Sequence, residues 1–295
     1  DKNVQPLSKE ESGEVWKKTR ALVLHKVGDV ARLQTDSLII SSFIAVAMSG
    51  IVDNYNLVIN AVTNFVNIIF NSVISGFGNL IATETRERQY ELFQVYRFFA
   101  SWVYGFAVTG FFVLLTPLIR IWLGDAWVLP ASAVTLILID LYFKGDRIVL
   151  SNYKTAAGVF EQDKYLALIQ GGVNLVLSIW LVQKIGLAGI YVGTVVSGLI
   201  ANLTKPVIIY RVCFDRPCRS YFAESFRYAG TVAVLAALLK VVGNRVMAQP
   251  GILNFLLMAV VITVVFNGVF LLLFGRTKEC RYLKQVVLRK LGKAV

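Results

Sequence analysis

Charge is absent from long stretches of this chain, and this absence excludes an ordinary soluble fold. The two longest stretches, Val246–Gly275 and Asn54–Thr83, are each thirty residues without a charged side chain. Shorter stretches of the same kind are Phe98–Ile119, Tyr165–Gln183 and Ile185–Thr204. A helix rises about 1.5 Å per residue, so about twenty apolar residues cross the hydrocarbon core of a bilayer. We therefore expect an all-α polytopic membrane protein.

Residues that carry catalysis and metal binding are also scarce. The chain has one histidine and three cysteines, and it contains no P-loop, no G-x-S-x-G sequence and no acidic cluster with metal-ligand spacing. Cys213 and Cys218 form a lone C-x4-C pair that lacks two further ligands for a structural zinc ion. The sequence therefore predicts free thiols, no metal site, no cofactor and no enzyme activity.

With 295 residues, 56% of them hydrophobic, the chain has room for about eight transmembrane helices. We expect them at residues 15–45, 50–80, 98–120, 128–157, 164–184, 187–210, 222–243 and 252–275. The first and fourth contain internal charges, so their assignment rests partly on the alternation of the connecting loops. Asp1–Arg20 is polar, has no hydrophobic signal region and resembles a connecting loop, which we interpret as the start of a fragment of a longer protein.

The net charge of +12 raises the question of a nucleic-acid partner, and the distribution of the basic residues argues against one. With a cytoplasmic N-terminus, twenty-one of the thirty Lys and Arg residues fall in inside segments. The outside loops hold four, Arg120, Lys184, Lys240 and Arg245. Cytoplasmic loops collect Lys and Arg because this asymmetry sets the orientation of membrane proteins. We therefore expect both ends of the chain in the cytoplasm and no role in binding nucleic acid.

Five asparagines repeat at helical spacing along the second expected span. They are Asn56, Asn60, Asn64, Asn67 and Asn71. At 100° per residue they fall within an arc of about 80°. One or two such amides would be explained by hydrogen bonds between membrane helices. Five on one face favour the wall of a hydrated cavity, because amides bind water, sugar hydroxyls or phosphate without burial of a charge.

The first expected span carries His25, Asp29, Arg32 and Asp36 on one face. An ionisable residue inside a membrane faces protein or water and is a functional candidate by default. A structural ladder of ion pairs from Asp29 through Arg32 to Asp36 explains the two acids equally well. For Arg32, which lies deeper in the span, we favour contact with a substrate.

The fourth expected span has a third polar face, with Asp140, Lys144, Arg147, Ser151 and Lys154 at spacings of three and four. Asp140 and Lys144 are placed to form an ion pair at i, i+4. Arg147 then adds surplus positive charge near the middle of the span, whereas Lys154 near its inner end is explained by snorkelling.

Together these faces predict a cavity that is lined by amides and carries net positive charge. Such a cavity favours an anionic ligand rich in hydroxyl groups, since guanidinium groups pair with phosphate and amides match sugar hydroxyls. Arg32, Lys144 and Arg147 are the expected phosphate-binding residues, and Asp29, Asp36 and Asp140 are candidates for binding a coupling ion. The expected outside loops are short, which favours transport over a glycan polymerase or ligase.

Five sequence segments resemble the second half of bacterial polysaccharide flippases, which belong to the multidrug/oligosaccharidyl-lipid/polysaccharide exporter superfamily. They cover residues 21–29, 34–41, 50–55, 60–64 and 70–84 and read ALVLHKVGD, QTDSLIIS, GIVDNY, NAVTN and FNSVISGFGNLIATE. The resemblance extends over the whole chain and is strongest over residues 20–100. It is specific for the family and not for the substrate.

The resemblance implies a two-lobe exporter of which this chain supplies the second lobe. Residues 1–14 would be a cytoplasmic connecting loop, 15–212 the six-helix lobe, 213–275 two additional helices and 276–295 a basic cytoplasmic tail. The implied activity is transfer of a polyprenyl-pyrophosphate-linked oligosaccharide across the bacterial cell membrane by alternating access, with H⁺ or Na⁺ as a coupling ion. The implied partners are this lipid-linked oligosaccharide, the membrane lipids and the N-terminal lobe missing from the chain. A cation-coupled exporter of small organic molecules within the same superfamily is the alternative.

The tail mixes basic residues with tyrosine, leucine and valine. This composition predicts a basic helix that lies on the anionic inner leaflet. A solvated end without regular structure, or a helix packed on the bundle, is the alternative.

Overall fold

The computed structural model describes residues 8, 12–13, 15–16, 19–20, 23, 35–249 and 251–290, and every regular element within these residues is helical. Residues 35–43 form a first helical stretch. The long helices that follow are α2 (Val46–Asn71), α3 (Val73–Thr83), α4 (Arg86–Leu123), α5 (Ala131–Asp146), α6 (Ile148–Ala157), α7 (Leu166–Ile185), α8 (Leu187–Ile209), α9 (Arg219–Val246), α10 (Ile252–Phe274) and α11 (Lys278–Lys290). Three short helical turns connect them, η1 (Asp125–Trp127), η2 (Glu161–Asp163) and η3 (Tyr210–Phe214).

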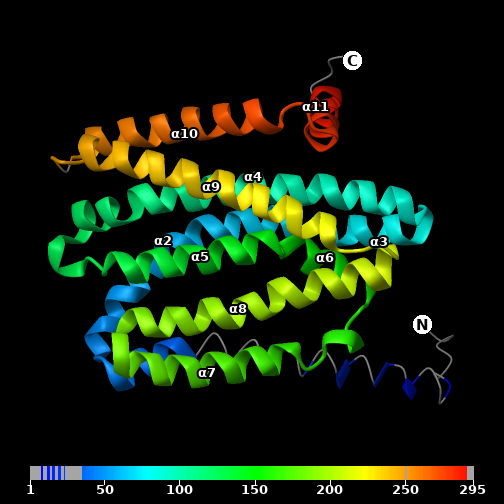
Figure 1. Ribbon diagram of the computed structural model, residues 1–295, viewed down its shortest axis with the longest axis horizontal. Coiled ribbons are helices and arrows are strands. Elements are labelled where there is room, and N and C mark those ends of the chain that lie inside the picture. The colour runs from blue at the N-terminus through cyan, green and yellow to red at the C-terminus, as the bar shows by residue number, and fades with distance from the viewer. Residues whose placement is uncertain are drawn as a thin grey trace, which may run out of the picture.

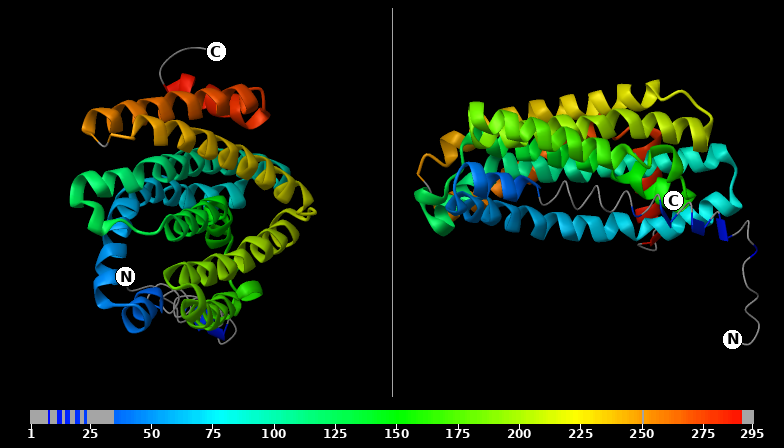
Figure 2. Two further views of the ribbon diagram at one scale, coloured as in Figure 1. Left: turned by 60° about the vertical axis from the view of Figure 1, so that its left-hand side comes forward. Right: turned by 90° about the horizontal axis from the view of Figure 1, so that it is seen from below.

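Most of these helices run side by side along one direction, and their connections gather at two ends (Figures 1 and 2). We call them the η1 end, which also holds the α7–α8 turn, and the α11 end, which also holds the α3–α4 and α8–α9 connections. Within the bundle α8 packs between α5 and α7, and α4 packs between α5 and α9. α10 lies against α4, and α3 lies against α6.

Within the part of the chain that the structure describes, six segments are long and apolar enough to cross a membrane, and all regular structure is helical, as in an all-α membrane protein. They are Val46–Thr83, Arg86–Leu123, Glu161–Ile185, Leu187–Phe214, Arg219–Val246 and Ile252–Phe274. Large apolar side chains cover their outward faces, with Phe226, Leu253 and Leu272 among the most exposed. An apolar exterior of this kind suits lipid rather than water.

The number of six differs from the eight spans expected from the sequence. Most of the first expected span lies outside the described residues. The fourth is divided at Arg147 into α5, of 16 residues, and α6, of 10 residues, and neither is long enough to qualify alone.

The division between α5 and α6 needs no proline. Arg147 has φ −96° and ψ 0°, a bridge conformation that interrupts the regular helix. Its guanidinium donates to the Asn202 amide oxygen and to the Gly198 carbonyl oxygen (3.4 Å), both on α8. Just before the break, a Cβ on Gly145 would lie 2.2 Å from the ring of Tyr104, so only glycine permits this approach of α4 to α5. Tertiary contacts on both sides therefore fix the break.

α4 is longer than expected, because it begins at Arg86 rather than near residue 98. Thr85 caps it by accepting a hydrogen bond from the Arg88 backbone amide at 3.4 Å. The additional turns carry Gln89, Gln94 and Arg97, and all three are buried. Arg97, which precedes the expected span at 98–120 and was counted among the basic residues of inside segments, thus lies within α4 and is buried.

α7 and α8 form the closest helix pair of the bundle. Small residues repeat along α8 at four-residue intervals, Gly189, Gly193, Ser197 and Ala201. A Cβ on Gly193 would lie 2.4 Å from the Ser178 hydroxyl oxygen of α7. Polar side chains of α7 then bond across the contact, for example from Gln170 to the Ser197 carbonyl at 2.9 Å. This is the small-residue packing that substitutes for hydrophobic driving force in membranes.

Candidate functional site

α2 has three distinct faces. Val52, Tyr55, Ile59, Val66 and Phe70 are among the buried residues of the face that points into the bundle. About a quarter of a turn away lies the asparagine face, on which Asn60, Asn64 and Asn71 are exposed and Asn56 and Asn67 half-buried. The third face is apolar and exposed, with Leu57, Phe65 and Ile68. The asparagines therefore lie between the buried face and the apolar face.

The asparagine face is mostly free of contacts between helices. Among the described residues only Asn67 makes a hydrogen bond through its side chain to another helix, accepting one from the Tyr104 hydroxyl of α4 at 2.7 Å. Hydrogen bonding between described helices therefore accounts for one of the five amides. Asn64 lies midway between the ends of the Val46–Thr83 segment, which is apolar enough to cross a membrane.

Asp53 belongs to the same face and was missed by the sequence analysis. It is exposed and precedes Asn56 by three residues, so it extends the polar face by one turn toward the η1 end. The spacing of three was a signal that could have identified it. Asp36 and Asp53 both lie within electrostatic reach of the Tyr191 hydroxyl of α8, so the two carboxylates belong to one region.

Lys144 and Asp140 form the expected ion pair on α5, with 2.7 Å between Nζ and Oδ2. The Asp140 side chain is 6% exposed, whereas the Lys144 side chain is 46% exposed. Lys144 lies midway between Ala131 and Ala157, the outer ends of α5 and α6. A cation is therefore accessible at the middle of the bundle, with its carboxylate partner behind it.

Tyr104 joins the asparagine face to the α5 cluster. Its hydroxyl holds Asn67, and its ring lies against Gly145, the residue next to Lys144. Tyr104 of α4 therefore contacts both α2, through Asn67, and α5, through Gly145.

The other basic residues of the fourth expected span are held inside the protein. Arg147 is buried and bonded to α8, as described above. Lys154 forms a buried ion pair with Asp163 of η2, with 2.6 Å between Nζ and each carboxylate oxygen, so the interpretation of Lys154 as a snorkelling residue is wrong. Lys205 of α8, which the sequence analysis did not single out, donates to the Ser151 hydroxyl at 3.2 Å.

Polar side chains of three segments meet around Thr194 of α8. The Thr194 hydroxyl donates to Asp36 Oδ2 at 2.9 Å and accepts from the Asn174 amide nitrogen at 3.1 Å. Asn174 is 0% exposed, and its amide oxygen has no hydrogen-bond partner among the described residues. A carboxylate, a hydroxyl and an unsatisfied amide oxygen are ligands suited to a small hard cation. Asp29 and Arg32, the other candidates of the first expected span, lie outside the described residues.

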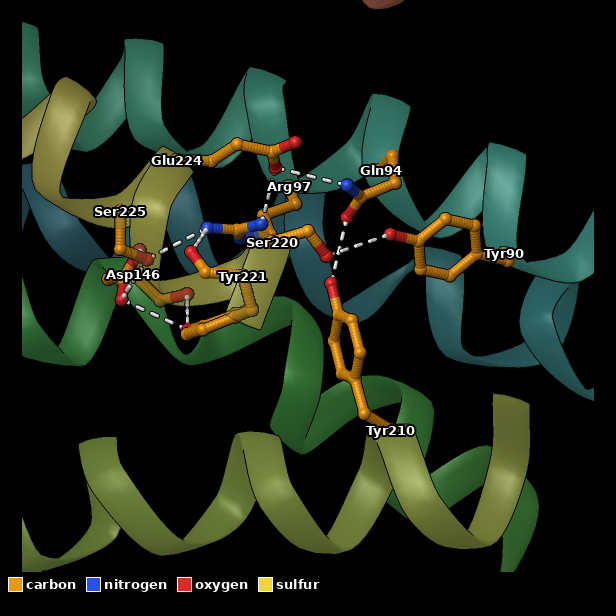
Figure 3. A network of polar contacts seen from close by, with 9 residues as sticks. All are labelled: Tyr90, Gln94, Arg97, Asp146, Tyr210, Ser220, Tyr221, Glu224 and Ser225. Carbon is orange, nitrogen blue, oxygen red and sulfur yellow. Dashed lines mark hydrogen bonds and ion pairs between the residues drawn. The ribbon is translucent and has the colours of Figure 1, made fainter. Parts of the chain in front are cut away.

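A further polar network joins α4, α5 and α9 toward the α11 end (Figure 3). The Arg97 guanidinium donates to Glu224 at 2.7 Å, to the Tyr221 carbonyl at 2.6 Å and to the Ser225 hydroxyl at 2.8 Å. It also lies 3.8 Å from the centre of the Tyr221 ring. Ser225 and the Tyr221 hydroxyl in turn donate to the Asp146 carboxylate. Arg97, Tyr221 and Asp146 are buried, so we assign the network to the joining of helices.

No family model matches the chain, and no curated protein or solved structure is significantly similar to it. Within the described residues no group of His, Cys, Asp and Glu side chains is arranged to hold a metal ion. The three cysteines are free thiols, as predicted.

Proposed function

We propose that this chain is the second lobe of a two-lobe exporter that moves a lipid-linked oligosaccharide across a bacterial cell membrane by alternating access. The observation that carries the proposal is the exposed asparagine face on a helix that is apolar enough to cross a membrane, together with the accessible Lys144. Polar groups within a membrane must meet water, a ligand or another protein surface, because lipid cannot satisfy them. A cavity between this lobe and a partner lobe meets that requirement.

The chemistry of the face suits a glycan attached to a phosphate-containing lipid. Exposed amides donate to and accept from sugar hydroxyls, and they remain neutral while the glycan moves past them. Lys144 supplies a positive charge for phosphate oxygens, while Asp140 keeps it fixed in place. We expected Arg147 to bind phosphate. In the proposal it instead stabilises the break between α5 and α6, next to the exposed Lys144.

The orientation in the proposal places the α11 end in the cytoplasm. Basic residues are frequent at that end, among them Arg86, Arg88, Lys164, Arg216 and Arg219. The η1 end has few, and it carries the exposed Trp122, Trp127 and Trp180, which suit an aromatic belt at a membrane interface. The proposal retains eight spans, with α5 and α6 together crossing as the fourth.

The coupling ion in the proposal is a monovalent cation bound by Asp36, Thr194 and Asn174. The unsatisfied amide oxygen of Asn174 supports this assignment, since a fully buried polar atom without a partner is costly. Asp140 is the weaker of the original candidates, because its carboxylate is buried and faces Lys144 rather than an open site.

An exporter of small organic cations is the second candidate, and Asp53 on the asparagine face is the observation that favours it. Such a substrate would need an acidic path, whereas Lys144 at mid-depth opposes it. Uptake or efflux of a cationic dye by vesicles that contain the protein would support this candidate.

The direct test of the proposal is complementation of a strain that lacks its polysaccharide flippase, using the protein that carries this chain. Lys144→Gln should reduce surface glycan by about tenfold at equal protein level, because the phosphate loses its cation at mid-depth. Lys184→Gln, at an exposed position on the η1 end, is the matched control and should keep full activity. Full surface glycan in Lys144→Gln, or no complementation by the unmodified protein, would contradict the proposal.

A further inference from the structure

Three residues separate α11 from the end of α10. Phe274 ends α10 as a buried residue, and α11 starts at Lys278. The Thr277 hydroxyl accepts from the Cys280 backbone amide at 3.3 Å, and Glu279 lies in the first turn, so the start of the helix is both capped and electrostatically favoured. A local sequence signal therefore fixes where α11 starts.

One side of α11 is docked on the protein. α11 packs against α4, with Cys280 buried and Leu283 packed on the core. The Arg88 guanidinium of α4 lies 5.6 Å from the centre of the Tyr282 ring. Burial raises the pKa of the Cys280 thiol, so this docked side chain is neutral. The tail is therefore not a solvated end, and its apolar side faces the bundle instead of the leaflet.

The opposite side of α11 is basic. Lys278, Arg281, Lys284 and Arg289 are exposed and fall within an arc of roughly 140° at 100° per residue. None of the four forms an ion pair or a hydrogen bond with the described residues. Glu279 is the only acidic residue of the helix and is half-buried. The protein itself thus leaves this positive face without counter-charge.

The position of α11 relative to α10 shows where the basic face lies along the direction of the membrane spans. α10 is a candidate membrane span, and only Gly275, Arg276 and Thr277 separate it from α11. Figure 1 shows α11 turned across the direction of α10. A helix placed this way lies at the boundary between the apolar span and water, where lipid headgroups lie.

We propose that α11 presents a preformed basic face to anionic phospholipid headgroups. The contact is electrostatic and needs no insertion of the helix, because the apolar side of α11 is already used by α4. This inference does not rest on the transported substrate. It assigns to the tail a partner of stated chemistry, a bilayer surface rich in a lipid such as phosphatidylglycerol.

The experiment uses the protein that carries this chain in nanodiscs of phosphatidylcholine, alone or mixed with phosphatidylglycerol. Backbone hydrogen exchange over residues 278–290 is the measurement. With phosphatidylglycerol, exchange in α11 should slow by about tenfold at low salt, and this protection should disappear at high salt. Replacement of Lys278, Arg281, Lys284 and Arg289 by Gln should abolish the difference between the two lipids.

A variant with Arg120, Lys184 and Arg245 replaced by Gln removes exposed charges at the other end and should keep the full lipid effect. Equal exchange in both lipids, or lipid-dependent protection that persists at high salt, would overturn the proposal. Should the fourfold variant fail to accumulate, the comparison of lipids and salt on the unmodified protein still decides. Failure of glycan transport in the complementation test leaves this result unaffected.

Discussion

The Arg97 guanidinium is enclosed by α9 on one side and by its own helix on the other, with 1% of its side chain exposed. It bonds directly to Glu224, Ser225 and the Tyr221 backbone. Through Ser225 and Tyr221 the same network reaches Asp146 at the end of α5. One side chain thus holds three helices together, two of which lie more than one hundred residues apart in sequence.

We predict that Arg97→Gln destabilises the folded protein by about 3–5 kcal/mol, because Glu224 and Asp146 lose the cation that compensates them. Thermal unfolding of the protein in detergent measures the change. Arg88→Gln, an exposed arginine of the same helix, should change the unfolding midpoint little. An unchanged midpoint in Arg97→Gln would mean that the network contributes nothing to holding α9.

A second prediction at the scale of single residues concerns ion binding by Asp36, Thr194 and Asn174. If they bind Na⁺, that ion should raise the midpoint of thermal unfolding by about 4 °C or more relative to choline, because it binds the folded state alone. Asp36→Asn and Thr194→Val should each lose this difference. Thr263→Val, at an exposed position on α10, should keep it. A sodium effect that survives both site variants would rule out this location for the ion.

At the scale of elements, the close approach of α7 to α8 depends on the absence of a side chain at Gly193 of α8. A Cβ on Gly193 would lie 2.4 Å from Ser178 Oγ and 2.9 Å from the Ser178 backbone nitrogen. Gly193→Ala should therefore separate the two helices and cost about 1–3 kcal/mol.

The matched control for this change is Gly172→Ala on α7, where a Cβ would meet nothing within 4 Å. It should leave stability unchanged or raise it slightly, because alanine favours helix over glycine. Both variants are compared by thermal unfolding. Equal behaviour of the two would show that the close approach of α7 and α8 carries no energetic weight.

Elements of this fold were predictable where the signal is local. Uncharged stretches located the cores of most membrane helices, and i, i+4 spacing predicted the pairing of Asp140 with Lys144. The break at Arg147 was not predictable, since it depends on Asn202 of α8 and on the fit of Tyr104 against Gly145. The burial of Arg97 and Lys154 could not be predicted for the same reason, because it depends on their partners Glu224 and Asp163. A charged residue at the edge of an apolar stretch resembles a loop residue until its partner is known.

At the scale of the whole molecule, the three faces of α2 should meet three different environments. The asparagine face should meet water at mid-membrane depth, while the apolar face one residue away meets lipid. Asn64 and Phe65 are neighbours in sequence, and both are exposed in this chain, with Phe65 at 68%. They therefore allow a comparison at one depth.

We predict that a cysteine at Asn64 reacts with a small charged thiol reagent in membranes, whereas a cysteine at Phe65 reacts at least about tenfold more slowly, because a thiol in lipid does not ionise readily. The measurement uses the full protein with its three native cysteines replaced by serine. Equal labelling at both positions would contradict the proposal of a water-filled cavity. Absence of labelling at Asn64 would mean that another protein surface covers the asparagine face permanently.

The polar contacts of α5 and α6 also constrain how the protein is made. This stretch carries Asp140, Lys144, Asp146, Arg147 and Lys154. Each charge at the centre of a helix opposes release from the translocon into lipid by about 2.5–3.5 kcal/mol. The groups that bond Arg147 and Asp146 lie on α8 and α9, which the ribosome synthesises later. We therefore expect α5 and α6 to leave the translocon late, after α8 and α9 have been synthesised.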